Sequence, residues 1–490
     1  MNDSPAPNAS RPRRIAVIGG GVSGLAAAHR AQTLLPEAEV RLYERGPRVG
    51  GALDSTRHDG WLLERGADSF TTKLAGAIDL CRELGIADQI VETNSQHRRA
   101  LIASGPRLLP TPAGFVLMRA NKIGSVLSTR LLSWRGKLRL LAEPFIAAPP
   151  EVQQPGYDES VASFATRRLG REAFERLVQP LLAGIYVADA TQLSLAGTMP
   201  EFLEAERTYG SLTRALWRGP RPAGATAERQ AAENNSSGAR YSVFVSLRSG
   251  VSGLVGALVD ALPANCVHRG VEVARVDRDS GGWRLRLIEN GQPRDEAFDA
   301  IILAAQAPLA GRLLAGVDAE LAGQLAKIRY ASSAVIGLVC RREDVGHDLD
   351  GFGFVVPAVE NRDLVAGSFA SVKYPGRLPD GLVHLRAFAG GALRPELVDR
   401  GDDELVALAR RELGELIGLR GEPLWSDVAR WRESMPQYDV GHVTLVDDIL
   451  ARVATHPGLA VAGNAYRGVG IPQCIASGRG AAEAVVGQLA

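Results

Sequence analysis

The feature that most constrains the fold of this chain is a glycine turn near its start. Gly19, Gly21 and Gly24 form a GxGxxG pattern directly between the apolar run at 14–18 and the helix-like run at 22–35. In such a strand–turn–helix unit, the first glycine allows a tight turn, the second lets a pyrophosphate approach the backbone, and the third lets the helix pack on the strand. The pattern predicts an α/β fold with a Rossmann-like, dinucleotide-binding unit.

An acidic residue stands where this unit needs one. Glu44 ends the predicted strand at 39–44 and follows Gly24 by 20 residues. A carboxylate at this place accepts hydrogen bonds from both hydroxyls of an adenosine ribose and disfavours a 2′-phosphate. We therefore expect a dinucleotide other than NADP. The alternative is a glycine-rich turn in an α/β fold that binds no nucleotide.

Composition limits the remaining choices. The 490 residues are 46% hydrophobic and 23% charged, which is typical of a soluble globular chain of about three domains. The net charge of +1 gives no general attraction to nucleic acid. The four cysteines stand far apart, so they predict neither a zinc site nor a disulfide scaffold, and a reducing cytoplasm fits them. No apolar run reaches the ~18 residues of a membrane span.

Motifs at both ends of the chain indicate which dinucleotide binds. Arg48-Val-Gly-Gly51 and Glu64-Arg-Gly-Ala-Asp-Ser69 follow Glu44, and Gly463-Asn464 and Gly468-Val-Gly-Ile-Pro472 precede a C-terminal helix. Together, and in this order, they resemble the large FAD-dependent amine oxidase and desaturase superfamily. The resemblance implies FAD as the cofactor, with the positive end of the C-terminal helix near the flavin ring.

Longer strings spread over nearly all 490 residues carry a narrower resemblance. They are GGGVSGLAAA (19–28), LVQPLLAGIYVADATQLSL (177–195), FVSLRSGVSGLVGAL (244–258), GFGFVVP (351–357), RWRESMPQYDVGH (430–442) and GVGIPQCIASGRGAA (468–482). They resemble the oxygen-dependent protoporphyrinogen and coproporphyrinogen oxidases of heme biosynthesis, and the last three look most like the Gram-positive branch. One departure is Tyr186-Val-Ala-Asp189, where the family usually has Tyr-Ala-Gly-Asp.

The resemblance implies a set of FAD contacts in five places along the chain. The glycine turn and Glu44 also follow from the residues themselves, whereas the other contacts rest on the resemblance. The backbone of Val273 is expected to pair with adenine. The implied contacts are Gly19, Gly20, Gly21, Val22, Ser23, Gly24, Glu44, Arg45, Gly51, Ala52, Gly66, Ala67, Asp68, Ser69, Val273, Asn464, Val469, Gly470 and Ile471.

The implied reaction is the oxidation of coproporphyrinogen III or protoporphyrinogen IX to the porphyrin, with O2 as acceptor and H2O2 as product. It removes six electrons in three two-electron steps, and flavin can accept a hydride in each of them. No metal is required. The sequence presents no His–carboxylate pair that predicts a catalytic base, and we expect His384 to be a core or surface histidine. The resemblance implies two substrate contacts. Arg99 is expected to bind a propionate and Phe388 to contact the macrocycle.

The element pattern and the resemblance together predict three structural parts. They are a discontinuous Rossmann-like FAD-binding domain, a mixed-sheet substrate-binding domain and a helical insertion, and we expect helices over 106–150. The predicted boundaries are 13–95, 241–305 and 430–490 for the FAD-binding domain, 96–104 and 306–429 for the substrate-binding domain, 105–215 for the helical insertion, and 1–12 and 219–240 for flexible segments.

The segment 93–142 contains nine basic residues and no acidic one, with apolar residues such as Phe115 and Trp134 between them. That composition is typical of a helical patch on an anionic membrane surface. It is equally typical of a helical domain with a basic outer face. Peripheral membrane contact through 105–142 and a soluble helical domain both stay open, as does the oligomeric state, a homodimer included.

Two other functions also stay open. A flavin amine oxidase or carotenoid desaturase would share the terminal motifs but not the strings at 177–195 and 430–442. A GDP dissociation inhibitor of small GTPases uses the same fold as a non-catalytic binder. Bound, reducible flavin would exclude the binder, and oxidation of porphyrinogens but not amines would exclude the other enzymes.

Overall fold

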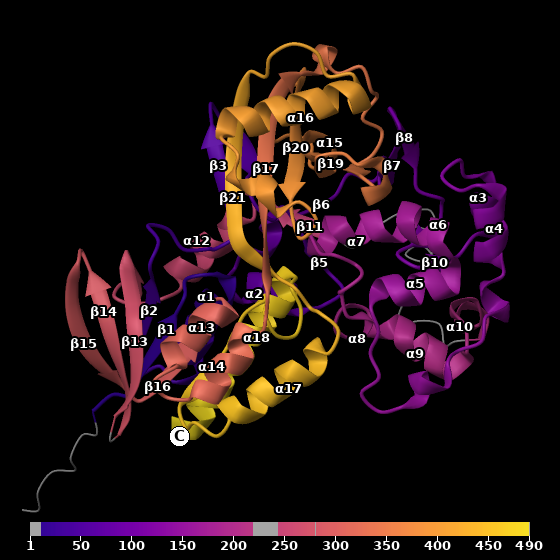
Figure 1. Ribbon diagram of the computed structural model, residues 1–490. Helices are drawn as coiled ribbons and strands as arrows, with labels where there is room; N and C mark the ends of the chain where they lie inside the picture. The colour runs from indigo at the N-terminus through magenta and orange to yellow at the C-terminus, as the bar shows by residue number, and fades with distance from the viewer. Residues whose placement is uncertain (1–10, 219–243, 280, 490) are drawn as a thin grey trace, which may run out of the picture.

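A computed structural model describes residues 11–218, 244–279 and 281–489. A five-stranded parallel sheet and a seven-stranded mixed sheet form its framework, and a group of short helices lies beside the second sheet (Figure 1). The mixed α/β architecture confirms the predicted fold class. The segments predicted to be flexible lie outside the described residues, except for Arg11 and Pro12.

The parallel sheet is built around β1, which is buried on both faces. Ile15 and Val17 point to one face and Ala16 and Ile18 to the other, because side chains alternate along a strand. Such continuous apolar strands are typical of parallel sheets covered on both sides. In spatial order the strands are β12 (Val267–Arg269), β2 (Glu39–Glu44), β1 (Arg14–Ile18), β16 (Ala300–Leu303) and β22 (Leu459–Val461).

Elements from distant parts of the chain cover these two faces. On one face α1 and α18 pack side by side, and Gly478 lies against the backbone of Ser23. The other face carries three helices and an antiparallel three-stranded sheet. The first group is α1 (Val22–Leu34), α2 (Gly76–Glu83), α12 (Ser252–Asp260) and α18 (Ile471–Leu489). The second is α13 (Ala307–Leu314), α14 (Ala319–Ala326), α17 (His442–Val453), β13 (Val271–Asp279), β14 (Gly282–Glu289) and β15 (Gln292–Phe298).

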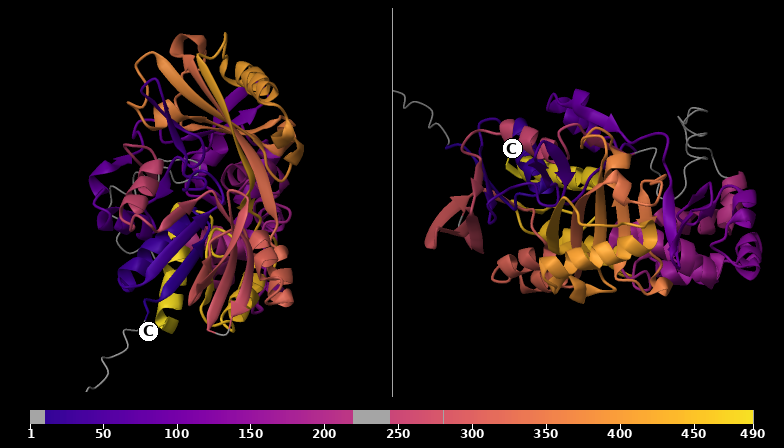
Figure 2. Two further views of the ribbon diagram at one scale, coloured as in Figure 1. Left: turned by 90° about the vertical axis from the view of Figure 1, so that its left-hand side faces the viewer. Right: turned by 90° about the horizontal axis from the view of Figure 1, so that it is seen from above.

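The seven-stranded sheet has an apolar face and a mixed face. Leu385 and Ala387 belong to an apolar core beneath α16 (Asp402–Ile417), whereas Arg386 and Phe388 point the opposite way. Figure 1 shows α16 lying across this sheet, and Figure 2 shows the two sheets in separate halves of the molecule. In spatial order the strands are β21 (Trp425–Pro436), β17 (Tyr330–Arg341), β20 (Leu382–Gly390), β19 (Leu364–Phe369), β18 (Gly353–Val355), β7 (Ala100–Ser104) and β8 (Arg107–Pro110).

The helical region starts later than predicted. β8 extends the seven-stranded sheet by pairing with β7, and a short β9–β10 ladder precedes α3, which begins at Ile123. Pairing with an existing sheet edge outweighs the helical preference of this Leu- and Arg-rich run. The bounds are β9 (Phe115–Val116), β10 (Arg119–Ala120), α3 (Ile123–Ser128), α4 (Trp134–Leu141), η2 (Glu143–Phe145), α5 (Val161–Leu169), α6 (Arg171–Ala173), the π-helical η4 (Phe174–Val178), α7 (Gln179–Tyr186), α8 (Leu195–Thr198), α9 (Pro200–Tyr209) and α10 (Leu212–Arg218).

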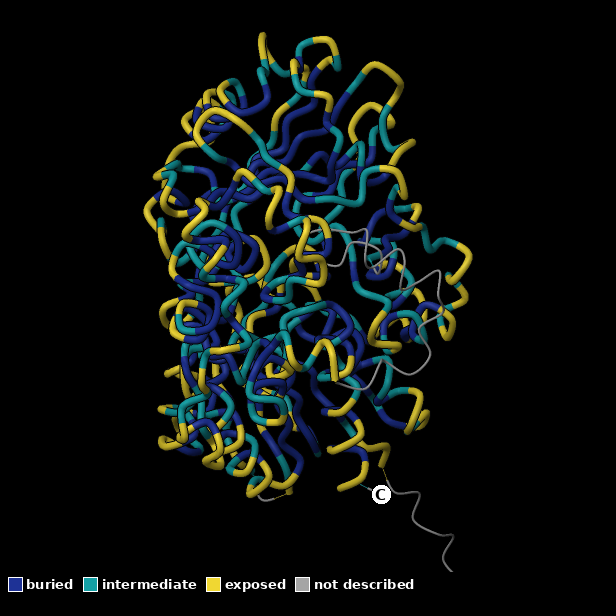
Figure 3. Tube along the Cα trace, turned by 90° about the vertical axis from the view of Figure 1, so that its right-hand side faces the viewer, coloured by how far each residue is buried: buried dark blue, intermediate teal, exposed yellow. Residues whose placement is uncertain are grey.

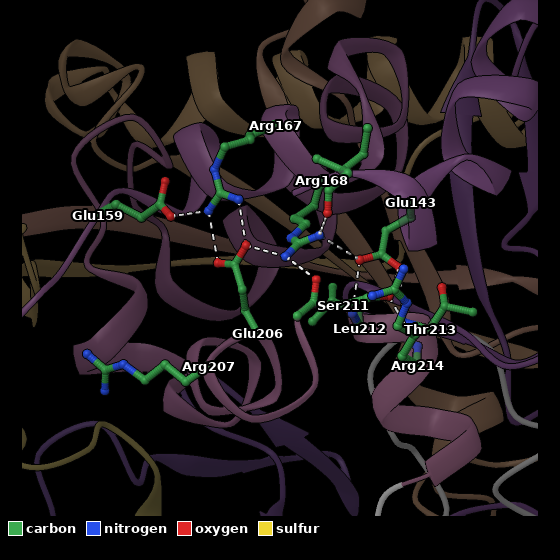
Figure 4. Close-up of polar contacts among 12 residues, drawn as sticks. Glu143, Glu159, Arg167, Arg168, Glu206, Arg207, Ser211, Leu212, Thr213 and Arg214 are labelled. Atoms are coloured by element: carbon green, nitrogen blue, oxygen red, sulfur yellow. Dashed lines mark hydrogen bonds and ion pairs between the residues drawn. The ribbon is translucent and has the colours of Figure 1, made fainter. Parts of the chain in front are cut away.

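A buried network of charges holds this helical region together (Figure 4). The side chains of Arg168 and Glu206 have no exposed surface and pair with each other. Arg167 Nη1 lies 2.6 Å from Glu206 Oε1, and Arg168 Nη1 lies 3.4 Å from Glu143 Oε1. Removing one partner of a buried pair typically costs about 3–5 kcal/mol. The network therefore fixes α5 against α9 and η2.

The sheets divide the chain differently from the predicted boundaries at two places. Residues 430–436 are part of β21, which pairs with β17 in the seven-stranded sheet. The segment 307–326, assigned from the sequence to the substrate-binding part, forms α13 and α14 on the parallel sheet. Figure 3 shows the buried segments in the interior of the molecule and the exposed ones at its periphery. The smaller strands are β3 (Ser55–His58), β4 (Trp61–Glu64), β5 (Phe70–Thr71), β6 (Ile90–Glu92) and β11 (Phe244–Leu247).

No helix within the described ranges is both long enough and apolar enough to cross a membrane.

Candidate active site

The glycine turn leaves an open space at the start of α1. Gly19 has a φ of +109°, and a Cβ there would overlap the carbonyl oxygen of Ala304. A Cβ on Gly24 would overlap the carbonyl oxygen of Gly19, so α1 can approach β1 only with glycine at that place. Gly21 caps α1 without a side-chain hydrogen bond, and a Cβ built there would meet no atom of the other described residues within 4 Å, apart from its chain neighbours. The backbone N–H groups at this helix start are therefore available to an anion such as a pyrophosphate.

Glu44 lies at the end of β2, directly beside this turn. Its Oε2 accepts a hydrogen bond from the N–H of Gly20 at 2.8 Å, and its Oε1 accepts one from the N–H of Gly46 at 2.7 Å. Each carboxylate oxygen retains capacity for a second donor. The carboxylate is thus fixed by the backbone and can still accept hydrogen bonds from ribose hydroxyls.

The predicted FAD contacts that follow Glu44 in the sequence are linked to the glycine turn by backbone hydrogen bonds. The N–H of Gly50 donates to the carbonyl of Gly20 at 2.7 Å, and the N–H of Ala67 donates to the carbonyl of Ala52 at 3.0 Å. The turn 66–69 is therefore hydrogen-bonded to Ala52, and Ala52 belongs to the segment 50–52, which is hydrogen-bonded to the glycine turn through Gly50. The structure brings these predicted residues together although they span about 50 residues of sequence.

The C-terminal loop is held by a buried tyrosine. The hydroxyl of Tyr438 donates to the carbonyl of Asn464 at 2.5 Å and accepts from the N–H of Gly468 at 2.8 Å. Burial raises the pKa of Tyr438, so the hydroxyl stays protonated. The ring stacks on His442 at a centroid distance of 3.9 Å. This anchor holds the predicted flavin-end residues 464–470 in front of the first turn of α18.

Several observations test whether these residues fit FAD. Gln473 Oε1 is buried and has no hydrogen-bond partner among the described residues. A Cβ built on Gly463 would meet nothing within 4 Å in the described part of the chain, apart from its chain neighbours. Val273 lies on β13, an edge strand of its sheet, so one edge of that strand's backbone is not used in the sheet. Open glycine surfaces, an unpaired buried acceptor and a free strand edge are what an extended dinucleotide requires, so the residues fit the cofactor.

The sheet opposite these loops presents buried polar side chains. His384 and Arg386 are each 2% exposed and share a face of β20 with the partly buried Phe388. Burial, together with Arg386 and Arg377, lowers the pKa of His384 to about 3. His384 is therefore neutral at physiological pH and a poor proton acceptor. A buried polar face is rare in a sheet core and indicates a functional surface.

The charge cluster that joins the two halves of this site was not identified from the sequence. Lys373 Nζ lies 2.8 Å from Asp68 Oδ1, and Arg386 Nη1 lies 3.1 Å from Asp68 Oδ2. Burial alone would raise the pKa of Asp68, but Lys373 and Arg386 outweigh it and hold that pKa well below its usual range. Asp68 and Lys373 are 305 residues apart, so no local pattern relates them. The one signal in the sequence was an arginine in the middle of the apolar run Leu382–Gly390.

The two predicted substrate contacts do not lie side by side. Phe388 aligns through β19 and β18 with Ile102 of β7, whereas Arg99 precedes that strand. Arg99 Nε donates to the carbonyl of Asp350 at 2.6 Å, and the guanidinium also pairs with the Asp350 carboxylate. A propionate would have to displace or share this partner. Both substrate contacts stay predictions.

The segment Tyr186–Asp189, which differs from the Tyr-Ala-Gly-Asp pattern, contains a residue in an unusual backbone conformation. Val187 ends α7 with a φ of 53° and a ψ of 30°, in the left-handed region that β-branched residues rarely adopt. Its carbonyl accepts a hydrogen bond from the N–H of Ala392 at 3.0 Å, and its side chain packs against Gly391. The strained residue thus joins the helical region to the end of β20, close to Phe388.

The family model that describes flavin containing amine oxidoreductases matches residues 22–486 of the chain. The chain therefore belongs to the flavin containing amine oxidoreductase family. The matched range begins at the first residue of α1 and contains Glu44 and the C-terminal loop described above. FAD, the cofactor predicted from the sequence, is confirmed at the level of the family.

Within that family the chain is similar to porphyrinogen oxidases. It is 31% identical to coproporphyrinogen III oxidase of Bacillus subtilis (strain 168). The similarity extends over 474 residues, which are 96% of this chain and 97% of the relative. It is 28% identical to protoporphyrinogen oxidase 2, chloroplastic/mitochondrial, of Arabidopsis thaliana, over 97% of this chain and 94% of the relative. A crystal structure from Exiguobacterium sp. 255-15, assigned as a protoporphyrinogen oxidase, matches with a TM-score of 0.83 and 27% identity, over 97% of this chain and 99% of that one.

Proposed function

We propose that this protein is an FAD-dependent oxidase that converts a porphyrinogen to the porphyrin in heme biosynthesis. The observation that carries the proposal is similarity over nearly the whole length, at 31% identity, to a coproporphyrinogen III oxidase. The geometry supports it, because a cradle that fits FAD faces a sheet surface with Arg386, His384 and Phe388. An aromatic side chain and a cation suit a flat, anionic macrocycle.

The reaction needs little acid–base chemistry from the protein. Each of three steps removes a hydride and a proton from the substrate, and bound flavin supplies the chemistry of hydride acceptance. We propose O2 as the final acceptor, which takes two electrons and two protons per step to give H2O2. The chain's own residues bind and orient the macrocycle and exclude water, and His384 remains neutral throughout.

Coproporphyrinogen III is the substrate that we propose to be preferred. It carries four propionates, whereas protoporphyrinogen IX carries two propionates and two vinyl groups. The strings at 351–357, 430–442 and 468–482, which look most like the Gram-positive branch, support this choice. Both substrates are expected to react, with a modestly higher kcat/KM for coproporphyrinogen.

The test is the rise of porphyrin fluorescence when air is admitted to enzyme mixed with each substrate, prepared without oxygen. An enzyme-free sample measures autoxidation, and an oxygen electrode should record three O2 consumed per porphyrin formed. A large preference for protoporphyrinogen would contradict the substrate choice. Oxidation of amines, or no enzyme-dependent oxidation of either porphyrinogen, would contradict the function itself.

We also propose that the helical region touches an anionic membrane surface. The elements α3, α4, η2 and α10 contact one another in that order, and together they carry an apolar tip of exposed side chains. The apolar tip consists of the exposed side chains of Ile123, Leu127, Trp134, Leu138, Phe145 and Trp217. Lys122, Arg130 and Arg135 are exposed beside it, whereas Lys137 is buried and donates to the carbonyl of Leu127. Such a pairing of apolar and basic residues favours shallow insertion among anionic lipids.

The membrane proposal is tested by co-sedimentation with vesicles of phosphatidylglycerol and of phosphatidylcholine. We expect binding to the anionic vesicles only, weakened by salt and lost in the double variant Trp134→Ser/Leu138→Ser. The matched control is Val359→Ser/Leu393→Ser, which removes two exposed apolar residues outside the apolar tip. Equal recovery in the supernatant with and without vesicles at low salt would overturn the proposal.

A further inference from the structure

Two buried cations from the seven-stranded half of the molecule, Lys373 and Arg386, bind the turn 66–69. Lys373 Nζ lies 2.8 Å from Asp68 Oδ1 and 3.0 Å from Ser69 Oγ. Arg386 pairs with Asp68 Oδ2 and donates to the carbonyl of Gly66. Lys373 is 8% exposed and Arg386 is 2% exposed, so water screens neither charge effectively.

Lys373 and Arg386 together carry two positive charges, and the carboxylate that they share balances only one of them. Asp68 is the only carboxylate, among the described residues, that pairs with either Lys373 or Arg386. Two other carboxylates of this region have cations of their own: Glu64 pairs with Arg377 at 3.0 Å, and Asp427 pairs with Arg65 at 2.6 Å. Two cations therefore share one carboxylate in a buried place.

Arg386 also has a donor that nothing in the described chain satisfies. Its Nε is buried and has no hydrogen-bond partner. A buried, unpaired donor typically costs about 1–3 kcal/mol, so such a group indicates a missing acceptor. The guanidinium lies over the ring of Phe388 at 5.1 Å from its centroid, on the mixed face of the sheet. One of the two cations that share Asp68 therefore also carries an unpaired donor.

We propose that Arg386 and Lys373 are positioning residues for the flavin, which fix the turn 66–69 and supply the positive charge that favours its reduction. This inference rests on the proposed function for the placement of the turn along the flavin. In each reductive step a C–H bond of the substrate breaks, two electrons and one proton pass to the flavin as hydride, and a second proton leaves the substrate for solvent. Bound flavin would gain one negative charge on accepting the hydride, and a buried cation at Arg386 or Lys373 would stabilise that charge strongly at low dielectric.

The test measures the two-electron midpoint potential of the bound flavin, by equilibration with a reference dye during slow anaerobic reduction. We expect Arg386→Met to lower the reduced-to-oxidised ratio tenfold or more at a given potential, which is a downward shift of about 30 mV or more. Arg386→Lys keeps the charge and should restore most of the potential. Lys373→Gln removes the same unit of charge from the other side of Asp68 and should also lower it, which keeps the test informative if Arg386→Met does not retain FAD.

The matched control is Arg362→Met, which breaks an ion pair with the 6% exposed Glu412 elsewhere in the seven-stranded half. It should lower the melting temperature without moving the potential. Unchanged potentials in Arg386→Met or Lys373→Gln holoenzyme would overturn the inference. The potential is measured on any flavin-loaded protein and needs no porphyrinogen, so absence of porphyrinogen oxidation in the unmodified protein would contradict the proposed function alone.

Discussion

Glu44 is held at both carboxylate oxygens by backbone N–H groups, so replacing it has two separable effects. Glu44→Ala should weaken FAD binding by about ten- to a hundredfold, because the ribose hydroxyls lose a charged acceptor worth roughly 1.5–3 kcal/mol. It should also lower the melting temperature of the FAD-free protein, because the N–H groups of Gly20 and Gly46 lose their acceptor.

The measurement is the FAD dissociation constant from flavin fluorescence, beside a thermal melt of FAD-free protein. Glu39→Ala is the control, because Glu39 lies at the other end of β2 and pairs with Arg14 and Arg41 there. An FAD dissociation constant unchanged by Glu44→Ala would mean that this carboxylate does not face the ribose.

Replacing Val187 tests whether its left-handed backbone conformation, next to the end of β20, destabilises the protein. Its left-handed conformation typically costs a β-branched residue about 1–3 kcal/mol, whereas glycine adopts it freely. We expect Val187→Gly to leave the melting temperature unchanged or raise it slightly, because relief of strain offsets the entropy that glycine adds to the unfolded chain.

Ile185→Gly provides the comparison, because Ile185 is 36% exposed and lies two residues earlier in the same helix, where glycine costs about 1 kcal/mol. A larger loss of stability in Val187→Gly than in Ile185→Gly would refute the strain argument.

At the scale of elements, α10 depends on one carboxylate for its start. Glu143 accepts hydrogen bonds from the hydroxyl of Ser211 at 2.7 Å and from the N–H groups of Leu212 and Thr213 at 2.9 Å and 3.0 Å. Glu143→Ala should therefore release α10, since a buried acceptor of several donors is worth about 3 kcal/mol or more. Hydrogen exchange of peptides from 212–218 should accelerate strongly.

Glu204→Ala on the neighbouring helix α9 is the control, because Glu204 is exposed and its carboxylate accepts from Thr208 within the same helix. Exchange in α10 that is equally slow in both variants would show that the apolar core alone holds this helix. Because α10 carries Trp217 of the apolar tip, its release should also weaken vesicle binding.

Elements defined by local signals were predictable, and elements defined by distant partners were not. The sequence predicts a helix over 401–418, and α16 spans Asp402–Ile417, because its amphipathic pattern and flanking glycines lie in one short segment. The strand β8 carries no such signal, since its identity comes from pairing with β7. For the same reason the glycine turn and Glu44 could be identified from the sequence, whereas the pairing of Asp68 with Lys373 could not.

For the whole molecule, cofactor binding and stability should be coupled. The residues predicted to contact FAD come from the glycine turn, β2, the turn 66–69, β13 and the loop before α18, so we expect that no single segment binds it alone. FAD should be bound without a covalent bond, because the four cysteines are free and buried and none lies in an attachment motif. At a free FAD concentration 100 times the dissociation constant, we expect about 2.7 kcal/mol of stabilisation.

Acid precipitation should release yellow flavin into the supernatant, and the melting temperature of the FAD-free protein should rise with added FAD. Adenosine, which lacks the pyrophosphate and the flavin, serves as the control and should raise it much less. Flavin colour that remained in the acid pellet would contradict the non-covalent attachment.

The side-by-side packing of α1 and α18 has a consequence for how the protein is made. Ribosomes synthesise α1 and its glycine turn several hundred residues before α18, yet α18 covers the apolar face of α1. A nascent chain therefore emerges with this face unprotected, which is a binding surface for chaperones during translation. The predicted FAD contacts in the loop before α18 are also synthesised last, so we expect stable FAD binding only after the whole chain has been made.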